Sequence, residues 1–296
     1  MSSRDLLLAL VVIVVWGLNF VVIMTGLQHM PPLLMGAMRF ALVVFPAILF
    51  VKRPQVPWRW LLAYGLTISL GQFAFLFSAM AVGMPAGLAS LVLQSQAFFT
   101  LLFAAMFIGE RVRVANLLGL VVAAAGLSMI GMQVDRIMTL AGFLLTICAA
   151  SMWALGNVIT RRIGKVNLVG LVVWGNLVPA LPFLALSWWL EGPAAIKGAL
   201  SGFGLESMLV LVYLALGATL LGYSIWGRLL SRYPASQVAP FSLLVPVVGL
   251  TSASLLLGDR LSQWQMIGAV LVMLGLLINV CGGWALDRLR SRAAAA

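Results

Sequence analysis

Long apolar runs separated by short polar connections are the dominant pattern of the chain. Ten such runs occur, and each approaches the length of about 17–25 residues that a helix needs to cross a bilayer. They cover residues 6–25, 33–51, 60–82, 86–108, 117–132, 140–159, 168–190, 205–226, 235–257 and 266–281. Helices can cross lipid because they satisfy their backbone hydrogen bonds internally. The pattern therefore predicts an all-α polytopic membrane protein with ten transmembrane helices.

The two halves of the chain carry the same landmarks in the same order. Residues 85–111 return without a gap as residues 234–260, at an offset of 149 residues. The matching positions are Pro85 and Pro234, Gly109 and Gly258, Glu110 and Asp259, Arg111 and Arg260, Gly119 and Gly268, and Gly126 and Gly275. Because five spans per half is an odd number, the second half enters the membrane from the opposite side. We therefore predict two inverted five-helix repeats, residues 1–135 and 136–296.

The composition and the positions of the charges narrow the class further. The chain is 63% hydrophobic and 8% charged, whereas soluble domains are roughly half apolar and a quarter charged. Its net charge of +11 could suggest a nucleic-acid partner, but the basic residues gather on one side of the predicted membrane. That side holds Arg4, Lys52, Arg53, Arg59, Arg111, Arg113, Arg161, Arg162, Lys165, Arg228, Arg232, Arg288, Arg290 and Arg292. The positive-inside rule then predicts that both termini are cytoplasmic, and the basic excess reports topology and contact with membrane lipid rather than nucleic acid.

Arg39 is the one formal charge that the pattern places clearly within a span. An intramembrane arginine costs about 2.5–3.5 kcal/mol even on insertion scales, so its side chain should face protein or water. Two roles remain open at this point. Arg39 holds the carboxylate of a substrate through a charge-assisted pair, or it bonds backbone carbonyls at helix ends.

Side-chain amides in the spans are the next candidates for ligand contacts. Gln94 and Gln96 are two positions apart, so on a regular helix they diverge by about 200°. Both amides therefore cannot face one cavity equally, and at most one of them is a direct ligand. We select Gln94, with Gln72 as the corresponding candidate in span three; hydrogen bonding between helices is the alternative use of both. Asn19 and Asn157 recur near Trp16 and Trp153 in the two halves. These four residues line a central path symmetrically, or they pack the helices.

Aromatic and proline residues of the second half complete the candidate site. Trp and Tyr near span ends are usually interface anchors. Trp174 and Tyr223 are expected to lie deeper in their spans, so we rank them as cavity candidates. Pro240 and Pro246 interrupt span nine, where such breaks free carbonyls and permit bending. A gate and a simple packing kink are both compatible with these prolines. We expect span four to contribute more to recognition and span nine more to bending.

Missing residue types exclude several functions. All seven acids fall at span ends or in loops, and the chain has no GxxxxGK[ST] phosphate loop. These absences predict no drive by ATP, no bound cofactor, no metal site and no enzymatic acid or base. They also favour facilitated export over proton antiport.

Several motifs together resemble a known family. WGLNFVV in span one, MRF at residues 38–40, GMPAGLASLVLQSQAFFT in span four and APFSLLVPVVGL in span nine resemble the EamA-type branch of the drug/metabolite transporter superfamily. MPP at residues 30–32, YGLTIS at 64–69, QFAFLF at 72–77 and GYSIWG at 222–227 are similar to bacterial exporters of O-acetylserine and cysteine. The resemblance implies a multi-pass protein of the bacterial inner membrane that exports small amino-acid metabolites by alternating access. Exporters of other amino acids or drugs share this scaffold, and a proton-coupled antiporter is a further alternative; the oligomeric state is not predicted.

Overall fold

The ten predicted spans are all present as helices. The computed structural model describes residues 1–110, 112–133, 137–164 and 166–293, and the side chains of residues 235–236 and 281–293 lie outside this description. Within it there are ten helices long and apolar enough to cross a membrane, and no strand. The all-α fold with ten spans is therefore confirmed. The proposed boundary between residues 135 and 136 falls outside the described residues.

Four spans are continuous α-helices and six are interrupted. The continuous spans are α1 (Ser3–Leu27), α7 (Val114–Gly131), α8 (Leu140–Ile163) and α16 (Gln263–Ala293), which are spans one, five, six and ten. Span two is α2 (Pro32–Val44) followed by a 3-10 turn at Ala47–Leu49, and span three joins α3 (Trp58–Tyr64), a π-helical segment at Gly65–Gly71 and α4 (Gln72–Ala81). Span four joins α5 (Ala86–Val92), a 3-10 turn at Leu93–Ser95 and α6 (Gln96–Ile108).

Three spans of the second half are also interrupted helices. Span seven joins α9 (Leu168–Gly175), α10 (Leu177–Leu186) and a π-helical segment at Ser187–Glu191, and α11 (Pro193–Ser201) lies in the connection that follows. Span eight joins α12 (Leu205–Val212), a π-helical segment at Tyr213–Leu221 and α13 (Gly222–Arg232). Span nine joins α14 (Ala235–Ser242) and α15 (Leu244–Leu257).

The interruptions of spans three and four recur in spans eight and nine at the offset of the sequence repeat. Shifted by 149 residues, the π-helical segment of span three falls on residues 214–220, inside the π-helical segment of span eight. The 3-10 turn of span four falls on residues 242–244, where α14 gives way to α15. Gly109 and Gly258 both end their helices with a positive φ, of 75° and 73°, which glycine adopts without a steric penalty. The repeat thus extends from sequence landmarks to local backbone geometry.

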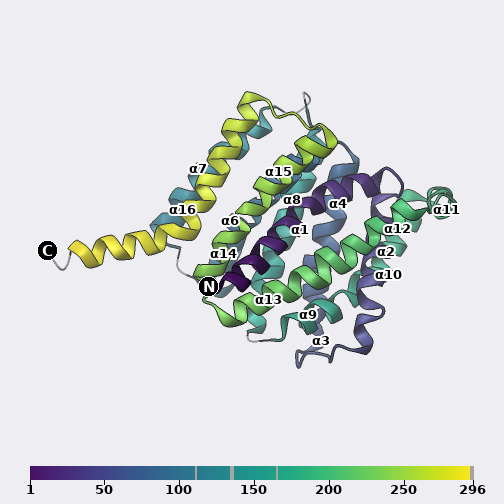
Figure 1. Ribbon diagram of the computed structural model, residues 1–296, viewed down its shortest axis with the longest axis horizontal. Helices are drawn as coiled ribbons and strands as arrows, with labels where there is room; N and C mark the ends of the chain where they lie inside the picture. Colours follow the sequence, from purple (N-terminus) through teal and green to yellow (C-terminus); the bar gives the residue numbers. More distant parts are fainter. Residues whose placement is uncertain (111, 134–136, 165, 294–296) are drawn as a thin grey trace.

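Spans five and ten lie side by side at one edge of the molecule, as α7 and α16 (Figure 1). Their backbones approach closely at two places. A Cβ added to Gly119 would lie 2.6 Å from the oxygen of Gly275, and one added to Gly126 would lie 2.6 Å from the oxygen of Gly268. Because the repeat matches Gly119 with Gly268 and Gly126 with Gly275, it exchanges these two contacts with each other. A two-fold relation between the halves requires that exchange, as expected for inverted repeats.

Candidate functional site

The other eight spans enclose a central cavity of about 500 Å³. This volume falls in the range of about 300–1,000 Å³ that is usual for small-molecule sites. Spans five and ten contribute no lining residue among those described. Eight of the nine predicted substrate-binding residues line the cavity, namely Trp16, Asn19, Arg39, Gln72, Gln94, Trp153, Asn157 and Tyr223.

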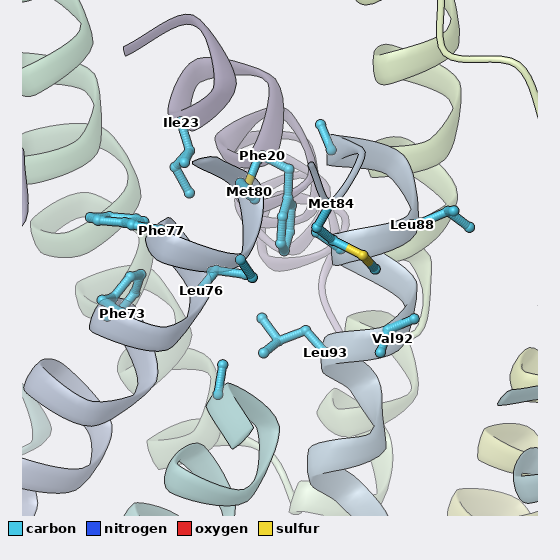
Figure 2. Packing of buried hydrophobic residues seen from close by; sticks show 14 of the residues in the cluster. Phe20, Ile23, Phe73, Leu76, Phe77, Met80, Met84, Leu88, Val92 and Leu93 are labelled. Carbon is cyan, nitrogen blue, oxygen red and sulfur yellow. The ribbon is translucent and has the colours of Figure 1, made fainter. Parts of the chain in front are cut away.

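The two ends of this cavity differ. At the basic end of the bundle, which carries the connections after spans two, four, six and eight, the lining includes Arg161, Leu168 and Leu230, and the Arg161 side chain is 49% exposed. Toward the opposite end the path is filled by apolar side chains with 8% exposure or less (Figure 2). We call this cluster the apolar plug; it comprises Phe20, Ile23, Phe73, Leu76, Phe77, Met80, Met84 and Leu88. Among the described residues, the cavity lining thus reaches an exposed side chain at the basic end and is bounded by buried apolar side chains toward the other end.

Arg39 lies on the cavity wall from α2 and is only 2% exposed. Its Nη2 donates to the hydroxyl of Thr219 at 3.0 Å, and its guanidinium carbon lies 4.1 Å from the ring centroid of Phe73. The Nε and Nη1 atoms are buried and have no hydrogen-bond partner in the structure. The alternative in which Arg39 bonds backbone carbonyls is therefore not observed. Two donor nitrogens of a buried cation are left for a ligand, a water molecule or an ion.

Neutral amides form a second group in the same cavity. Gln72 Oε1 and Asn19 Oδ1 are buried without a partner, and the two residues are 3% and 8% exposed. Gln94 donates its side-chain amide to the main-chain oxygen of Ser242 at 3.4 Å. Buried amide oxygens without partners are costly in a protein interior, so these two acceptors are suited to donors that a ligand brings.

A hydrogen-bonded cluster on spans four and six contains a residue that the sequence analysis set aside. Asn157 Nδ2 donates to Gln96 Oε1 at 2.9 Å and to the hydroxyl of Thr100 at 3.1 Å. Gln96 and Gln94 both line the cavity, and which of them contacts a ligand directly stays a prediction. The 3-10 turn at Leu93–Ser95 changes the angle between them, which the sequence analysis took from a regular α-helix.

Aromatic side chains cover the wall formed by spans one and eight. The ring of Trp16 lies 5.3 Å from that of Tyr223 and 5.4 Å from that of Trp226, measured between centroids. Trp16 Nε1 donates to the main-chain oxygen of Ala218 at 2.9 Å, which fixes its orientation. Trp153 lines the cavity from span six. This wall offers an apolar, π-rich surface, whereas spans four and six contribute amides.

Trp174 is not a cavity residue, and that prediction is wrong. Its Nε1 donates to the main-chain oxygen of Val51 at 2.9 Å, and its ring packs against Trp58 with centroids 6.4 Å apart. Both contacts lie at the basic end, where spans two, three and seven meet. Trp174 is thus an anchor of helix ends, the usual position of tryptophan at a membrane interface.

The two prolines of span nine have different positions. Pro240 lies inside α14, close to its end at Ser242. Pro246 is buried in the first turn of α15, where a missing N–H is well tolerated. Shifted by the repeat offset of 149 residues, the break in span four falls on the break in span nine, although span four contains no proline. Both spans are therefore interrupted, and the division into recognition by span four and bending by span nine stays a prediction.

Thr219, Thr100 and Tyr64 are lining or supporting residues that the sequence analysis missed. Threonine and tyrosine are common in membrane helices, so residue type alone carried little information. Tyr64 offered one usable signal, because it matches Tyr213 at the repeat offset of 149 residues.

A polytopic helical bundle that encloses a cavity lined by apolar and polar side chains, with one end bounded by buried apolar residues, is the architecture of a membrane transporter. The model of the EamA-like transporter family matches this chain twice, over residues 4–132 and 140–281. The chain belongs to the EamA-like transporter family.

Relatives of known sequence cover almost the whole chain. A protein of Salmonella typhimurium strain LT2, named a probable amino-acid metabolite efflux pump, is 54% identical over 288 residues. The match covers 95% of this chain and 96% of that protein. A protein of the same name from Escherichia coli K12 is 51% identical over 292 residues, with the same coverage. A solved crystal structure at 22% sequence identity has a TM-score of 0.65 and covers 97% of this chain and 100% of its own; it shares the fold.

Proposed function

We propose that the protein exports small amino-acid metabolites, with O-acetylserine and cysteine as its main substrates. The single observation that carries the proposal is the buried Arg39, which presents two unpartnered donors at the wall of the central cavity. The names of the two relatives at 54% and 51% identity support the class of substrate. Export requires no reaction of the substrate, so we propose that the protein is a transporter and not an enzyme.

In this proposal the carboxylate of the substrate pairs with Arg39. Charge-assisted hydrogen bonds to a carboxylate are about twice as strong as neutral ones, and the rings of Phe73 and Phe40 lie beside the guanidinium. The remaining polar groups of the substrate meet the amides of Gln72, Asn19 and Gln94. The aromatic wall contacts its carbon and sulfur atoms.

The inverted repeat supports the proposal of alternating access. The present structure is open at the basic end and closed by the apolar plug. Shifted by 149 residues, Phe77 of the plug corresponds to Trp226, which lies on the cavity wall toward the basic end. We propose that the halves exchange conformations, so that side chains around Trp226 close the basic end while the plug opens.

We place the protein in the bacterial inner membrane with both termini in the cytoplasm. Helical bundles belong to this membrane, whereas the spanning proteins of the outer membrane are β-barrels. The excess of Lys and Arg on one set of connections supports the orientation. The observed state is then open to the cytoplasm, where an exporter collects its substrate.

No Asp, Glu or His lines the described part of the cavity, which supports export down the metabolite gradient without proton coupling. A proton-coupled antiporter and an exporter of other amino acids or drugs remain the alternatives. Flux of O-acetylserine, cysteine and aromatic amino acids in proteoliposomes, with and without an imposed pH gradient, tests all three. We expect O-acetylserine and cysteine flux that does not need the gradient. Absence of both fluxes contradicts the substrate, and a strict need for the gradient contradicts the uncoupled mechanism.

A further inference from the structure

The charges of the central cavity are all of one sign. Among the described residues, Arg39 and Arg161 are the ionisable side chains of fixed charge that line it, and both are cationic. Arg161 is paired with Glu110, with 2.7 Å between Nη1 and Oε2, and Glu110 does not line the cavity. Arg39, deeper and almost fully buried, has only the neutral hydroxyl of Thr219 and aromatic rings as partners.

A free amino acid meets this cavity with two opposite charges. Its carboxylate compensates Arg39, because a buried cation strongly favours an anionic partner. Its ammonium group finds no carboxylate on the described cavity wall. The unpartnered acceptors there are the neutral oxygens of Asn19 and Gln72, and the positive field of Arg39 opposes a second cation. The site therefore favours binding of the carboxylate and does not favour binding of the positively charged amine.

Acylation of the amine removes the positive charge, for which the described cavity wall offers no carboxylate. An N-acyl amino acid keeps its carboxylate and replaces the ammonium with a neutral N–H donor and a carbonyl acceptor. Amide oxygens at Asn19 and Gln72 accept such an N–H, and the amide nitrogens of neighbouring glutamines donate to such a carbonyl. The cavity volume of about 500 Å³ leaves room for the added acyl group.

We propose that the protein recognises small polar carboxylates whether or not they carry an α-ammonium group, so that N-acylated amino acids such as N-acetylserine are also exported. This inference rests on the proposed function, because it uses the same cavity and the same role of Arg39. It extends the substrate class from zwitterions to monoanions.

The test compares three ligands of similar size and different charge in proteoliposomes. They are O-acetylserine, a zwitterion; N-acetylserine, a monoanion; and the methyl ester of O-acetylserine, a cation without a carboxylate. The assays run at about pH 6, below the pKa of about 7.7–8 of an α-amino group, so that the amine stays protonated. Efflux of labelled O-acetylserine is measured against each competitor, and efflux of labelled N-acetylserine is measured directly.

We expect N-acetylserine to be transported and to compete at concentrations within about threefold of O-acetylserine itself. The methyl ester should be weaker by at least about tenfold, the factor that corresponds to one charge-assisted contact. Arg39→Gln should weaken the recognition of both carboxylates together, whereas Arg162→Gln, the same change outside the cavity lining, should weaken neither.

Each result decides between the two proposals. O-acetylserine flux without transport or competition by N-acetylserine overturns this inference and leaves the proposed function intact. N-acetylserine flux without O-acetylserine flux supports the inference and overturns the proposed substrate. A methyl ester that competes as well as its parent overturns the inference, because the carboxylate is then not recognised, and no flux of either ligand overturns both proposals.

Discussion

Gln94 donates its side-chain amide to the main-chain oxygen of Ser242, 3.4 Å away across the interface between spans four and nine. In an unbroken helix that oxygen accepts the N–H of the residue four positions later. That residue is Pro246, which has no N–H. The proline of span nine thus leaves free the carbonyl that the glutamine of span four uses. The residue proposed for recognition, Gln94, and the proline proposed for bending, Pro246, are thus linked through one carbonyl oxygen.

Pro246→Ala should therefore weaken substrate recognition through Gln94. The new N–H competes for the Ser242 oxygen and releases the Gln94 amide, at a cost of about 0.5–1.5 kcal/mol for one hydrogen bond. We expect the half-saturating substrate concentration for efflux to rise by roughly two- to tenfold. Pro193→Ala, at the start of the peripheral helix α11, is the matched control and should behave as the unchanged protein. In the Gln94→Ala background Pro246→Ala should add nothing further, and fully additive effects would contradict the shared carbonyl.

Arg39→Gln should remove the principal contact with the substrate carboxylate. A hydrogen bond to a charged group contributes about 1.5–3 kcal/mol, so the half-saturating concentration of O-acetylserine should rise by roughly 10–100-fold. Arg39→Lys keeps the charge but loses the planar donor pair, and we expect an intermediate effect. The measurement is efflux from proteoliposomes at equal amounts of monodisperse protein. Unchanged efflux in Arg39→Gln would exclude Arg39 as a ligand of the substrate.

The fold was predictable because its strongest determinants are local in the sequence. Bilayer thickness fixes the length of each apolar run, and glycine is needed where a helix ends with a positive φ, as at Gly109 and Gly258. These glycines therefore indicate both where spans four and nine end and how the two repeats align. The inverted orientation followed from the odd number of spans, and the paired close approaches of α7 and α16 agree with it.

The detailed site was less predictable because it depends on departures from regular helix. The prediction assumed a regular α-helix across span four and therefore directed Gln94 and Gln96 to different faces. In the structure a 3-10 turn interrupts the helix there, and both residues line the cavity. Trp174 was misplaced because depth along a span does not report which neighbour receives the indole N–H. Thr219 was missed because its role depends on Arg39, a residue 180 positions away in the chain.

Gly119→Ala should destabilise the protein although it alters no cavity residue. The added Cβ would lie 2.6 Å from the oxygen of Gly275, and the backbone at this position cannot move aside as a flexible side chain does. Overpacking of a close interface costs about 1–3 kcal/mol, so we expect a lower thermal midpoint in detergent. Gly198→Ala is the matched control, because no atom lies within 4 Å of its Cβ position and its φ is not positive. Equal thermal midpoints of the two variants would contradict the close packing of spans five and ten.

Phe77 and Trp226 occupy matching positions of the two repeats, so alanine substitutions at them should shift the conformational equilibrium in opposite directions. Phe77 is fully buried in the apolar plug of the observed state, and its loss should favour the state that opens at the plug. Trp226 lies on the open cavity wall, and we propose that it is buried only when the basic end closes. Loss of a large buried aromatic side chain costs about 3–5 kcal/mol, enough to change populations strongly.

A cysteine introduced at Leu230, on the cavity wall toward the basic end, reports this equilibrium in a background without Cys148 and Cys281. An impermeant maleimide added from the basic side should label the Trp226→Ala protein faster and the Phe77→Ala protein more slowly than their parent. Trp226→Phe keeps an aromatic ring and should label at the parental rate. Both alanine variants should also transport more slowly, because each lacks one closed state. Labelling rates that move in the same direction for both would show that the two residues are not alternate plugs of an inverted repeat.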